Sequence, residues 1–247
     1  MSLVVFDNVT KRFNGRAVLN GLSFTVEKGE ILAVVGPSGT GKSVTLRHLV
    51  RLLSPTSGRV LFDGIDVGGC SDDELESVRR RIGYLFQSGA LLAWMTVAEN
   101  VALPLEETTA LSDPEIDRKV AEALAAVDLT DAADRYPAQI SGGMQKRAGL
   151  ARAIVRDCEL VLYDEPTSGL DPVTAVTIHR LIRDLSRTRG LTSILVTHDL
   201  VGALAIADRV LLLKEGRVAL CATPDEFVRS ENADVREFLS AMKGECI

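Results

Sequence analysis

The residues best suited to chemistry form a glycine-rich loop at residues 36–43, Gly-Pro-Ser-Gly-Thr-Gly-Lys-Ser. The loop fits the phosphate-binding pattern G-x-x-x-x-G-K-[ST] at every required position. Its glycines allow a tight turn that brings backbone N–H groups close to phosphate oxygens. Lys42 would reach the β- and γ-phosphates, and the Ser43 hydroxyl would ligate Mg²⁺. The predicted nucleotide contacts are Gly36, Pro37, Ser38, Gly39, Thr40, Gly41, Lys42 and Ser43.

A pair of carboxylates follows the apolar segment 160–163. Asp164 comes directly after this predicted strand, so its carboxylate should lie at a sheet edge, where it would hold Mg²⁺, most often through water. Glu165 is next, and we expect it to point elsewhere because side chains alternate along a strand. A lone Asp-Glu pair is more often a surface feature. The apolar strand before it and the phosphate loop upstream favour a catalytic pair.

Three further polar features stand at the ends of predicted elements. Gln87 follows the predicted strand 82–86, and His198 follows the apolar run 194–196 and Thr197. Neither residue would be distinctive alone. Ser141-Gly142-Gly143-Met144 begins a predicted helix, which supplies a second anion-binding helix end downstream of the phosphate loop.

The phosphate loop, the S-G-G helix start and the Asp-Glu pair, in this order, resemble the ATP-binding subunit of an ABC transporter over nearly the whole chain. The resemblance implies that Glu165 polarises the attacking water. It also implies that Gln87 senses the γ-phosphate and is a ligand of Mg²⁺. It implies that His198 bonds a γ-phosphate oxygen. Phe13 takes the place of the aromatic residue that stacks on adenine, although it could equally be a core aromatic.

The resemblance also implies an active site shared between two copies of the chain. One chain cannot easily place its own S-G-G helix start against its own phosphate loop when a helical lobe separates them. In the family two subunits pair head to tail, so Ser141, Gly142 and Gly143 would complete the partner's site in a homodimer that encloses two ATP molecules. Asp171 is the last residue of Ser168-Gly169-Leu170-Asp171, which matches the family's D-loop, a segment that would link the two sites across the dimer interface. The alternative interpretation of Ser168-Gly169 is a simple turn.

One departure from the family pattern is Met144, which stands where glutamine is common, while Ile140 replaces a leucine. S-G-G-M followed by Lys146-Arg147, together with Phe-Gln-Ser-Gly-Ala-Leu at residues 86–91, is similar to the ATPases of Mce-type phospholipid transport systems. This similarity implies a permease and an Mce-domain lipid-binding protein as partners. The alternative is the ATPase of an importer or exporter for another cargo, such as amino acids or sugars. The permease should contact residues 87–99, with Trp94 and Met95 as candidates, unless Trp94 is a core residue.

Composition limits the remaining possibilities. The 247 residues carry a net charge of −6, which argues against a general nucleic-acid binder. No apolar run approaches the roughly 18 to 20 residues that cross a bilayer. The first residues lack the pattern of a secretion signal. The four cysteines are widely spaced, which argues against a cysteine metal site or a disulfide. The three arginines at residues 79–81 are typical of a solvent-exposed helix end. We expect a cytoplasmic protein, peripheral on the cytoplasmic face of the inner (plasma) membrane.

The order of apolar segments predicts one α/β domain over residues 1–247. Residues 1–87 and 158–222 should form the nucleotide-binding core, 88–157 a helical subdomain and 223–247 a short helical extension. The resemblance implies a RecA-like P-loop NTPase core with an antiparallel β region. The predicted strands are 4–9, 22–26, 31–35, 60–62, 82–86, 160–163, 192–196, 209–213 and 217–220. The predicted helices start at Gly41, Asp72, Asp113, Ser141, Pro172, Asp199 and Thr223.

Overall fold

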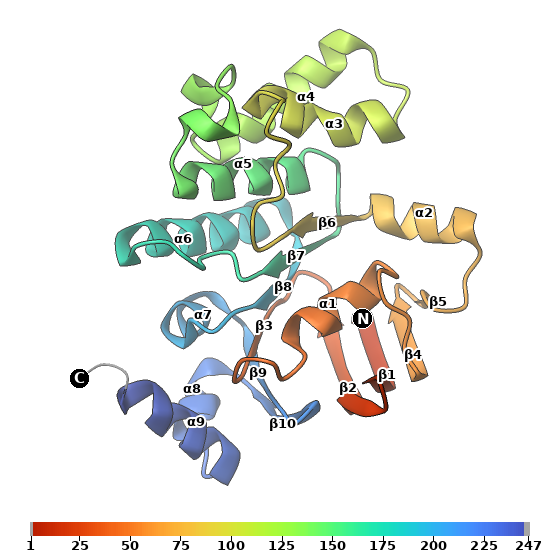
Figure 1. Ribbon diagram of the computed structural model, residues 1–247, viewed down its shortest axis with the longest axis vertical. Coiled ribbons are helices and arrows are strands. Elements are labelled where there is room, and N and C mark those ends of the chain that lie inside the picture. Colours follow the sequence, from red (N-terminus) through yellow and green to blue (C-terminus); the bar gives the residue numbers. More distant parts are fainter. Residues whose placement is uncertain (1, 245–247) are drawn as a thin grey trace. The chain divides into compact units, whose positions relative to one another are not determined.

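The structure, a computed structural model, describes residues 2–244 and has the predicted α/β architecture (Figure 1). It divides into two compact units. The first unit comprises residues 1–78 and 192–247, and the second comprises residues 79–191. The boundary at residue 78 falls within helix α2 (Asp72–Arg80).

The first unit contains two groups of strands. An antiparallel sheet has the order β2-β1-β4-β5, and a mixed group has the order β10-β9-β3-β8, in which β3 is parallel to β8 and β9. All five residues of β3 are buried, which explains their uninterrupted apolar run. The strand bounds are β1 (Ser2–Phe13), β2 (Arg16–Glu27), β3 (Ile31–Val35), β4 (Ser57–Phe62), β5 (Ile65–Asp66), β8 (Thr192–Val196), β9 (Arg209–Lys214) and β10 (Arg217–Ala222).

Four helices lie wholly in the described part of the first unit: α1 (Lys42–Leu49), α7 (Leu200–Ile206), α8 (Pro224–Arg229) and α9 (Ala233–Gly244). Helix α1 packs on β4 and β8, and α8 and α9 pack on β10. Phe227 and Val235 are fully buried and anchor the C-terminal helices, while Phe238 and Leu239 are half-buried. Residues 245–247 of the predicted extension lie outside the described residues.

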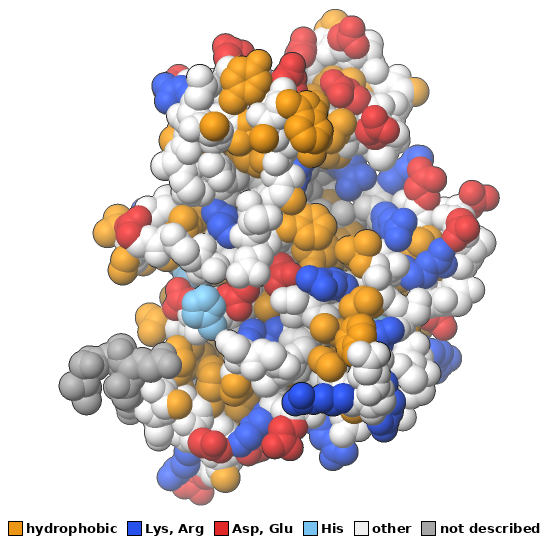
Figure 2. Space-filling model, viewed as in Figure 1, with side chains coloured by type: hydrophobic (Ala, Val, Ile, Leu, Met, Phe, Trp, Pro, Cys, Tyr) orange, Lys and Arg blue, Asp and Glu red, His pale blue; other side chains and the backbone are white. Residues whose placement is uncertain are grey.

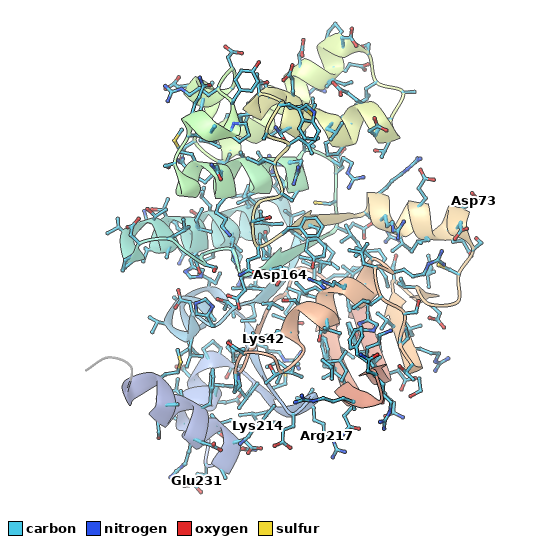
Figure 3. All side chains as sticks on the ribbon, in the orientation of Figure 1. Lys42, Asp73, Asp164, Lys214, Arg217 and Glu231 are labelled. Atoms are coloured by element: carbon cyan, nitrogen blue, oxygen red, sulfur yellow. The ribbon has the colours of Figure 1, made fainter. Side chains whose placement is uncertain are left out.

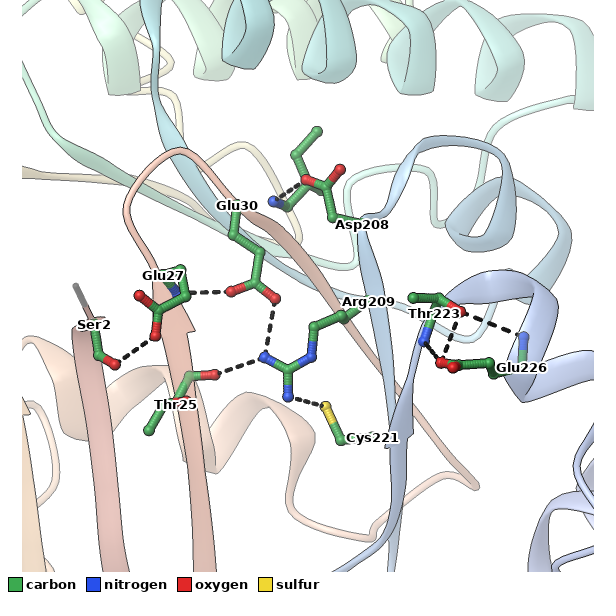
Figure 4. Close-up of polar contacts among 10 residues, drawn as sticks. Ser2, Thr25, Glu27, Glu30, Asp208, Arg209, Cys221, Thr223 and Glu226 are labelled. Atoms are coloured by element: carbon green, nitrogen blue, oxygen red, sulfur yellow. Dashed lines mark hydrogen bonds and ion pairs between the residues drawn. The ribbon is translucent and has the colours of Figure 1, made fainter.

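An ion pair between buried Glu30 and partly exposed Arg209 connects segments of the first unit (Figure 4). Glu30, 8% exposed, accepts a hydrogen bond from Arg209 Nη1 at 3.2 Å. The same nitrogen donates to the Thr25 carbonyl at 3.3 Å, and Nη2 donates to Cys221 Sγ at 2.9 Å. Asp208 accepts from the Ile31 backbone N–H at 2.9 Å. These contacts tie the end of β2 and the start of β3 to β9 and β10, and they give the buried carboxylate of Glu30 a partner.

The second unit combines two parallel strands, β6 (Ile82–Leu85) and β7 (Leu160–Asp164), with a group of helices. These are α3 (Val97–Thr108), α4 (Asp113–Ala126), α5 (Gly142–Ile154) and α6 (Pro172–Arg189), with short 3₁₀ turns at Thr130–Ala132 and Pro137–Gln139. Residues 88–157, all described, contain no strand. Helix α5 packs on β6, α3, α4 and α6.

Two predictions about surface residues of the second unit need correction. Arg79 and Arg80 are exposed as expected of a solvated helix end, but Arg81 forms an ion pair with Glu159, Nε to Oε1 at 2.6 Å. Trp94 is 75% exposed, so the interpretation of Trp94 as a core residue is wrong. Figure 2 shows hydrophobic side chains exposed at the top of the view, over the helices that Figure 1 labels α3, α4 and α5.

Candidate functional site

The phosphate loop connects β3 to α1 in the first unit and requires glycine at its first position. Gly36 has φ +148°, and a Cβ there would lie 2.2 Å from the carbonyl oxygen of Leu213. Lys42, labelled in Figure 3, is 7% exposed. Its Nζ donates hydrogen bonds to the carbonyls of Gly36 at 2.8 Å and Pro37 at 3.0 Å. The loop therefore curls around the ammonium group of its own lysine.

This loop has the donor set that nucleotide phosphates need. Helix α1 begins at Lys42, and its N-cap residue, Gly41, provides no side chain to cap the first-turn N–H groups. These N–H groups, the positive end of the helix dipole and Lys42 can all serve a phosphate. Pro37, Ser38 and Gly39 are exposed. The residues present therefore fit a polyphosphate.

The expected magnesium ligands are a hydroxyl, an amide and a carboxylate, and they are divided between the units. Ser43 belongs to the first unit, while Gln87 and Asp164 belong to the second. No group of three or more His, Cys, Asp or Glu that could hold a metal occurs among the described residues. The donors named here suit a cation that takes part of its oxygen shell from phosphates and water, as magnesium does.

The carboxylate pair lies at the end of β7 in the second unit. Asp164, the last residue of the strand and labelled in Figure 3, is 5% exposed, and Tyr84 Oη donates to its Oδ2 at 3.4 Å. Glu165 lies beyond the strand with φ +51°, a left-handed conformation uncommon for residues other than glycine. Strand alternation, our predicted reason for its direction, is therefore wrong. The backbone turn at Glu165 sets where its side chain points.

Lys146 connects Gln87 to this pair, which we did not predict. Lys146 is only 7% exposed on α5, and its Nζ donates to the backbone carbonyls of Gln87 and, at 3.4 Å, of Glu165. Burial lowers the pKa of Lys146, and the charges of Glu165 and Asp164 oppose that shift. In the sequence, Lys146 stood out only as part of a basic dipeptide after the S-G-G motif. Its contacts depend on segments 59 and 19 residues away.

The S-G-G segment begins α5 as predicted. Ser141 is the N-cap, and its Oγ accepts from the Met144 N–H at 3.3 Å. Gly142 is exposed, and a Cβ there would meet nothing closer than 3.9 Å. Gly143 is buried, and a Cβ there would lie 2.6 Å from Thr174 Cγ2. Gly143 therefore allows α5 and α6 to approach closely, whereas Gly142 leaves backbone accessible to a ligand.

Met144 is not compensated by the glutamine that follows it. Met144 is half-buried and offers no side-chain amide. Gln145 Nε2 donates to the Pro137 carbonyl at 2.8 Å, so its amide is engaged within the second unit. Gln145 therefore does not supply the side-chain amide that Met144 lacks.

Asp171 is the N-cap of α6, an interaction that the Asp-Pro sequence predicts. Its Oδ1 accepts from the N–H groups of Val173 at 3.0 Å and Thr174 at 3.1 Å, and its Oδ2 accepts from Thr174 Oγ1 at 2.6 Å. These bonds, that of the Thr174 hydroxyl first, lower the pKa of Asp171. The side chain therefore has a structural role whether or not it contacts a partner subunit.

The remaining candidates belong to the first unit. His198 is exposed shortly after the end of β8. Phe13 is 41% exposed at the end of β1, before a hairpin turn in which Asn14 and Gly15 both have positive φ. Lys11 Nζ lies 5.2 Å from the centre of the Phe13 ring. Phe13 is therefore not a core aromatic, and its ring is available for stacking.

Comparison with known proteins identifies the chain. The profile of the family described as ABC transporter matches residues 19–168. The chain belongs to the ABC transporter ATP-binding family. It is 44% identical over 247 residues to the methionine import ATP-binding protein MetN of Cereibacter sphaeroides, covering 98% of this chain and 70% of that protein. It is 40% identical over 244 residues to the intermembrane phospholipid transport system ATP-binding protein MlaF of Haemophilus influenzae, covering 99% and 91%.

A solved structure agrees with this membership. The ATP-binding cassette MJ0796, whose dimeric post-hydrolysis state is bound to ADP and Pi, is 35% identical with a TM-score of 0.81, covering 90% of this chain and 98% of that chain. The predicted P-loop ABC ATPase fold is confirmed. The chain is the ATP-hydrolysing subunit of an ABC transporter, with ATP and Mg²⁺ as its nucleotide and metal. No helix among residues 2–244 is long and apolar enough to span a bilayer.

Proposed function

We propose that the chain works as a nucleotide-driven homodimer that moves a membrane permease, on the cytoplasmic face of the membrane. The observation that carries this proposal is the phosphate loop, in which Lys42 lies among loop carbonyls at the uncapped start of α1. The solved cassette similar to this chain is dimeric with bound ADP and Pi, which supports the paired arrangement. Gly142, exposed at the start of α5, supports a contact with nucleotide bound by a second copy.

The proposed roles follow the chemistry of each side chain. Magnesium, when bound, would supply positive charge against the negative charge that develops on the phosphates during hydrolysis. Ser43, Asp164 and Gln87 would hold it. Glu165 accepts a proton from the attacking water and orients it. His198 donates a hydrogen bond to a γ-phosphate oxygen.

The remaining residues bind or complete the nucleotide site. Phe13 stacks on the adenine ring. Asp171 links the two sites across the dimer, a role beside its N-cap bonds in α6. We propose the domain organisation expected from the sequence, with residues 88–157 as a helical subdomain that contacts the permease.

The permease contact is proposed at the loop that presents Trp94. Asn100, fully buried on α3, accepts from the Leu92 N–H at 2.7 Å and donates to the carbonyls of Leu92, Met95 and Thr96 at 2.9 to 3.1 Å. These four bonds hold the loop while Trp94 remains 75% exposed. A fixed, exposed tryptophan is suited to anchor a partner in a pocket.

We infer phospholipid as the cargo, moved between membranes by a permease and an Mce-domain lipid-binding protein. The S-G-G-M signature with Met144 favours this interpretation, and the MlaF relative, a phospholipid transport ATPase by name, supports it. The MetN relative supports the alternative of a small-molecule importer, with methionine as the cargo its name gives. The two relatives are 40% and 44% identical to this chain, so identity alone does not separate the alternatives.

Two variants test the ATPase assignment. Lys42→Ala should abolish ATP binding in equilibrium titration, because the phosphates lose their cation. Glu165→Gln should keep ATP binding, stop phosphate release and accumulate a dimer in light scattering. Glu215→Gln is the matched control, since Glu215 is exposed and also has positive φ, +50° against +51°. Normal hydrolysis by Glu165→Gln would show that Glu165 is not the base.

The cargo is tested by purifying the tagged protein with detergent from its native membranes and identifying the proteins and lipids that accompany it. A permease with an Mce-domain protein and phospholipid would support the lipid assignment. A permease with an amino-acid- or sugar-binding protein would contradict the lipid cargo and leave the ATPase assignment intact.

A further inference from the structure

Lys11 contacts one face of the aromatic ring at position 13, near the end of β1. Its Nζ lies over the Phe13 ring, 5.2 Å from the ring centre. This distance is within the roughly 6 Å of a cation–π contact, in which the electron-rich face of the ring attracts the ammonium group. The Phe13 side chain is nevertheless 41% exposed. A planar base that stacks on this ring therefore has the face opposite Lys11.

A second contact fixes the ammonium group of Lys11. Lys11 Nζ donates a hydrogen bond to the carbonyl of Ser54 at 2.7 Å. The backbone beside it is held to the same segment, because the Arg12 N–H donates to Thr56 Oγ1 at 3.0 Å and the Thr56 N–H donates to the Thr10 carbonyl at 2.7 Å. A free lysine side chain has many rotamers, and these contacts restrict them. The cation therefore has a defined position under the ring.

The strands that carry this ring also pack against the phosphate loop, and both belong to the first unit. A Cβ at Gly41 would lie 2.8 Å from Leu19 Cδ2 and 3.1 Å from the carbonyl oxygen of Val18 on β2. Leu19 is the Cα partner of Lys11 in the pairing of β1 with β2. Lys11 is thus one strand away from a residue that lies against the phosphate loop. The loop could hold the phosphates of a nucleotide while the ring stacks on its base.

We propose that Lys11 is a positioning residue for the nucleotide base. It fixes the orientation of the Phe13 ring and leaves the opposite ring face for adenine. This inference rests on the proposed stacking of Phe13 on adenine. A ring that is already held on one side loses less conformational freedom when a base stacks on the other side, which favours binding. Lys11 acts through the ring, so it affects ligands that contain a base and spares ligands that consist of phosphate alone.

The test is calorimetric titration of the full chain with two ligands. ADP contains the base and has no γ-phosphate to hydrolyse, whereas inorganic pyrophosphate lacks the base. Lys11→Met keeps the unbranched stem and removes the charge, and it should weaken ADP binding about two- to fivefold, the effect of a cation–π contact at an exposed site. Lys11→Arg should retain most of the affinity. Lys28→Met removes the same charge from an exposed lysine of the same unit, so it is the matched control and should leave both affinities nearly unaltered.

A second substitution, Phe13→Leu, separates this inference from the adenine role. Phe13→Leu should weaken the binding of ADP and not that of pyrophosphate. Adding Lys11→Met to Phe13→Leu should cause no further loss, because the ring through which Lys11 acts is gone. Unchanged ADP affinity in Phe13→Leu would refute the adenine role and this inference with it.

Three other results would overturn the role of Lys11 and leave the adenine role intact. The first is unaltered ADP affinity in Lys11→Met beside a loss in Phe13→Leu. The second is a loss in Lys11→Met that is equal for ADP and pyrophosphate, which would indicate a general effect of charge or structure. The third is full additivity of the two substitutions on ADP affinity, which would show that Lys11 acts independently of the ring.

Discussion

Replacing Lys146 with methionine should slow ATP hydrolysis while leaving ATP affinity almost unchanged. Lys146 is buried on α5, and its ammonium group donates to the backbone carbonyls of Gln87 and Glu165. Methionine preserves most of the unbranched stem and its packing but removes the donor. Gln87 follows β6 and Glu165 follows β7. Without the ammonium group of Lys146, the backbone carbonyls of these two residues would lose a shared hydrogen-bond donor.

The magnitude follows from these contacts. A hydrogen bond to a charged group contributes about 1.5 to 3 kcal/mol, and the burial that lowers the Lys146 pKa offsets part of this. We therefore expect the free energy of unfolding to fall by about 1 to 2 kcal/mol. A displacement of about 1 Å at a positioned catalytic group can cost about 100-fold in rate. We expect kcat to fall by about 10- to 100-fold, with KM for ATP within about threefold, because the phosphate loop is unchanged.

The assay is steady-state phosphate release over a range of ATP concentrations, with urea unfolding of the same samples. Lys146→Arg keeps N–H donors and should recover most of kcat. Arg147→Met is the matched control, because Arg147 neighbours Lys146 on α5 but donates to the carbonyls of Val127 and Asp128. It should reduce stability and leave kcat nearly unaltered. Equal kcat in Lys146→Met and Arg147→Met would refute the reasoning, and so would a loss confined to KM.

Three other predictions depend on contacts within the second unit. Gly142→Ala should leave the melting temperature nearly unchanged yet reduce ATP-driven dimer formation in light scattering; Gly143→Ala should lower the melting temperature, since its Cβ would lie 2.6 Å from a neighbouring side chain. Asn100→Ala should reduce the free energy of unfolding by about 2 to 4 kcal/mol, measured by urea titration. It should also lower the fluorescence anisotropy of Trp94, the sole tryptophan, because the loop that carries Trp94 loses its hydrogen bonds to Asn100. Unchanged anisotropy would contradict the role of Asn100 in holding this loop. The folded-state pKa of Asp171 lies below its ordinary value of 3.8. The stabilisation that its carboxylate gives is therefore complete above pH 3.8 and is lost as the pH falls through the folded-state pKa. The difference in melting temperature between the unaltered protein and Asp171→Asn should vanish under strongly acidic conditions.

Most helix starts and the positions of the buried core strands could be predicted closely, because their causes are local. The first two strands are longer than predicted: β1 covers Ser2–Phe13 against the predicted 4–9, and β2 covers Arg16–Glu27 against the predicted 22–26. Ser112, Asp171 and Thr223 lie at helix N-caps, where a side-chain oxygen or a nearby glutamate satisfies backbone N–H groups. The apolar run 31–35 is a fully buried strand with the predicted bounds. By contrast, β5 is only two residues long and has no periodicity to detect. Helix α3 was not predicted as a separate element, although its Thr96 forms a capping box with Glu99.

The amino-acid sequence by itself determined the family, the phosphate loop and the candidate catalytic residues, because these depend on residue type and spacing within short segments. The tertiary structure decided which of those residues also serve the fold. Gly143 is a packing glycine, and Asp171 satisfies the first turn of α6. It also decided that Asn100 and Lys146 matter, since each contacts carbonyls whose positions depend on the folded chain. A hydrogen-bond partner many residues away leaves no pattern in the sequence, so only packing in three dimensions reveals it.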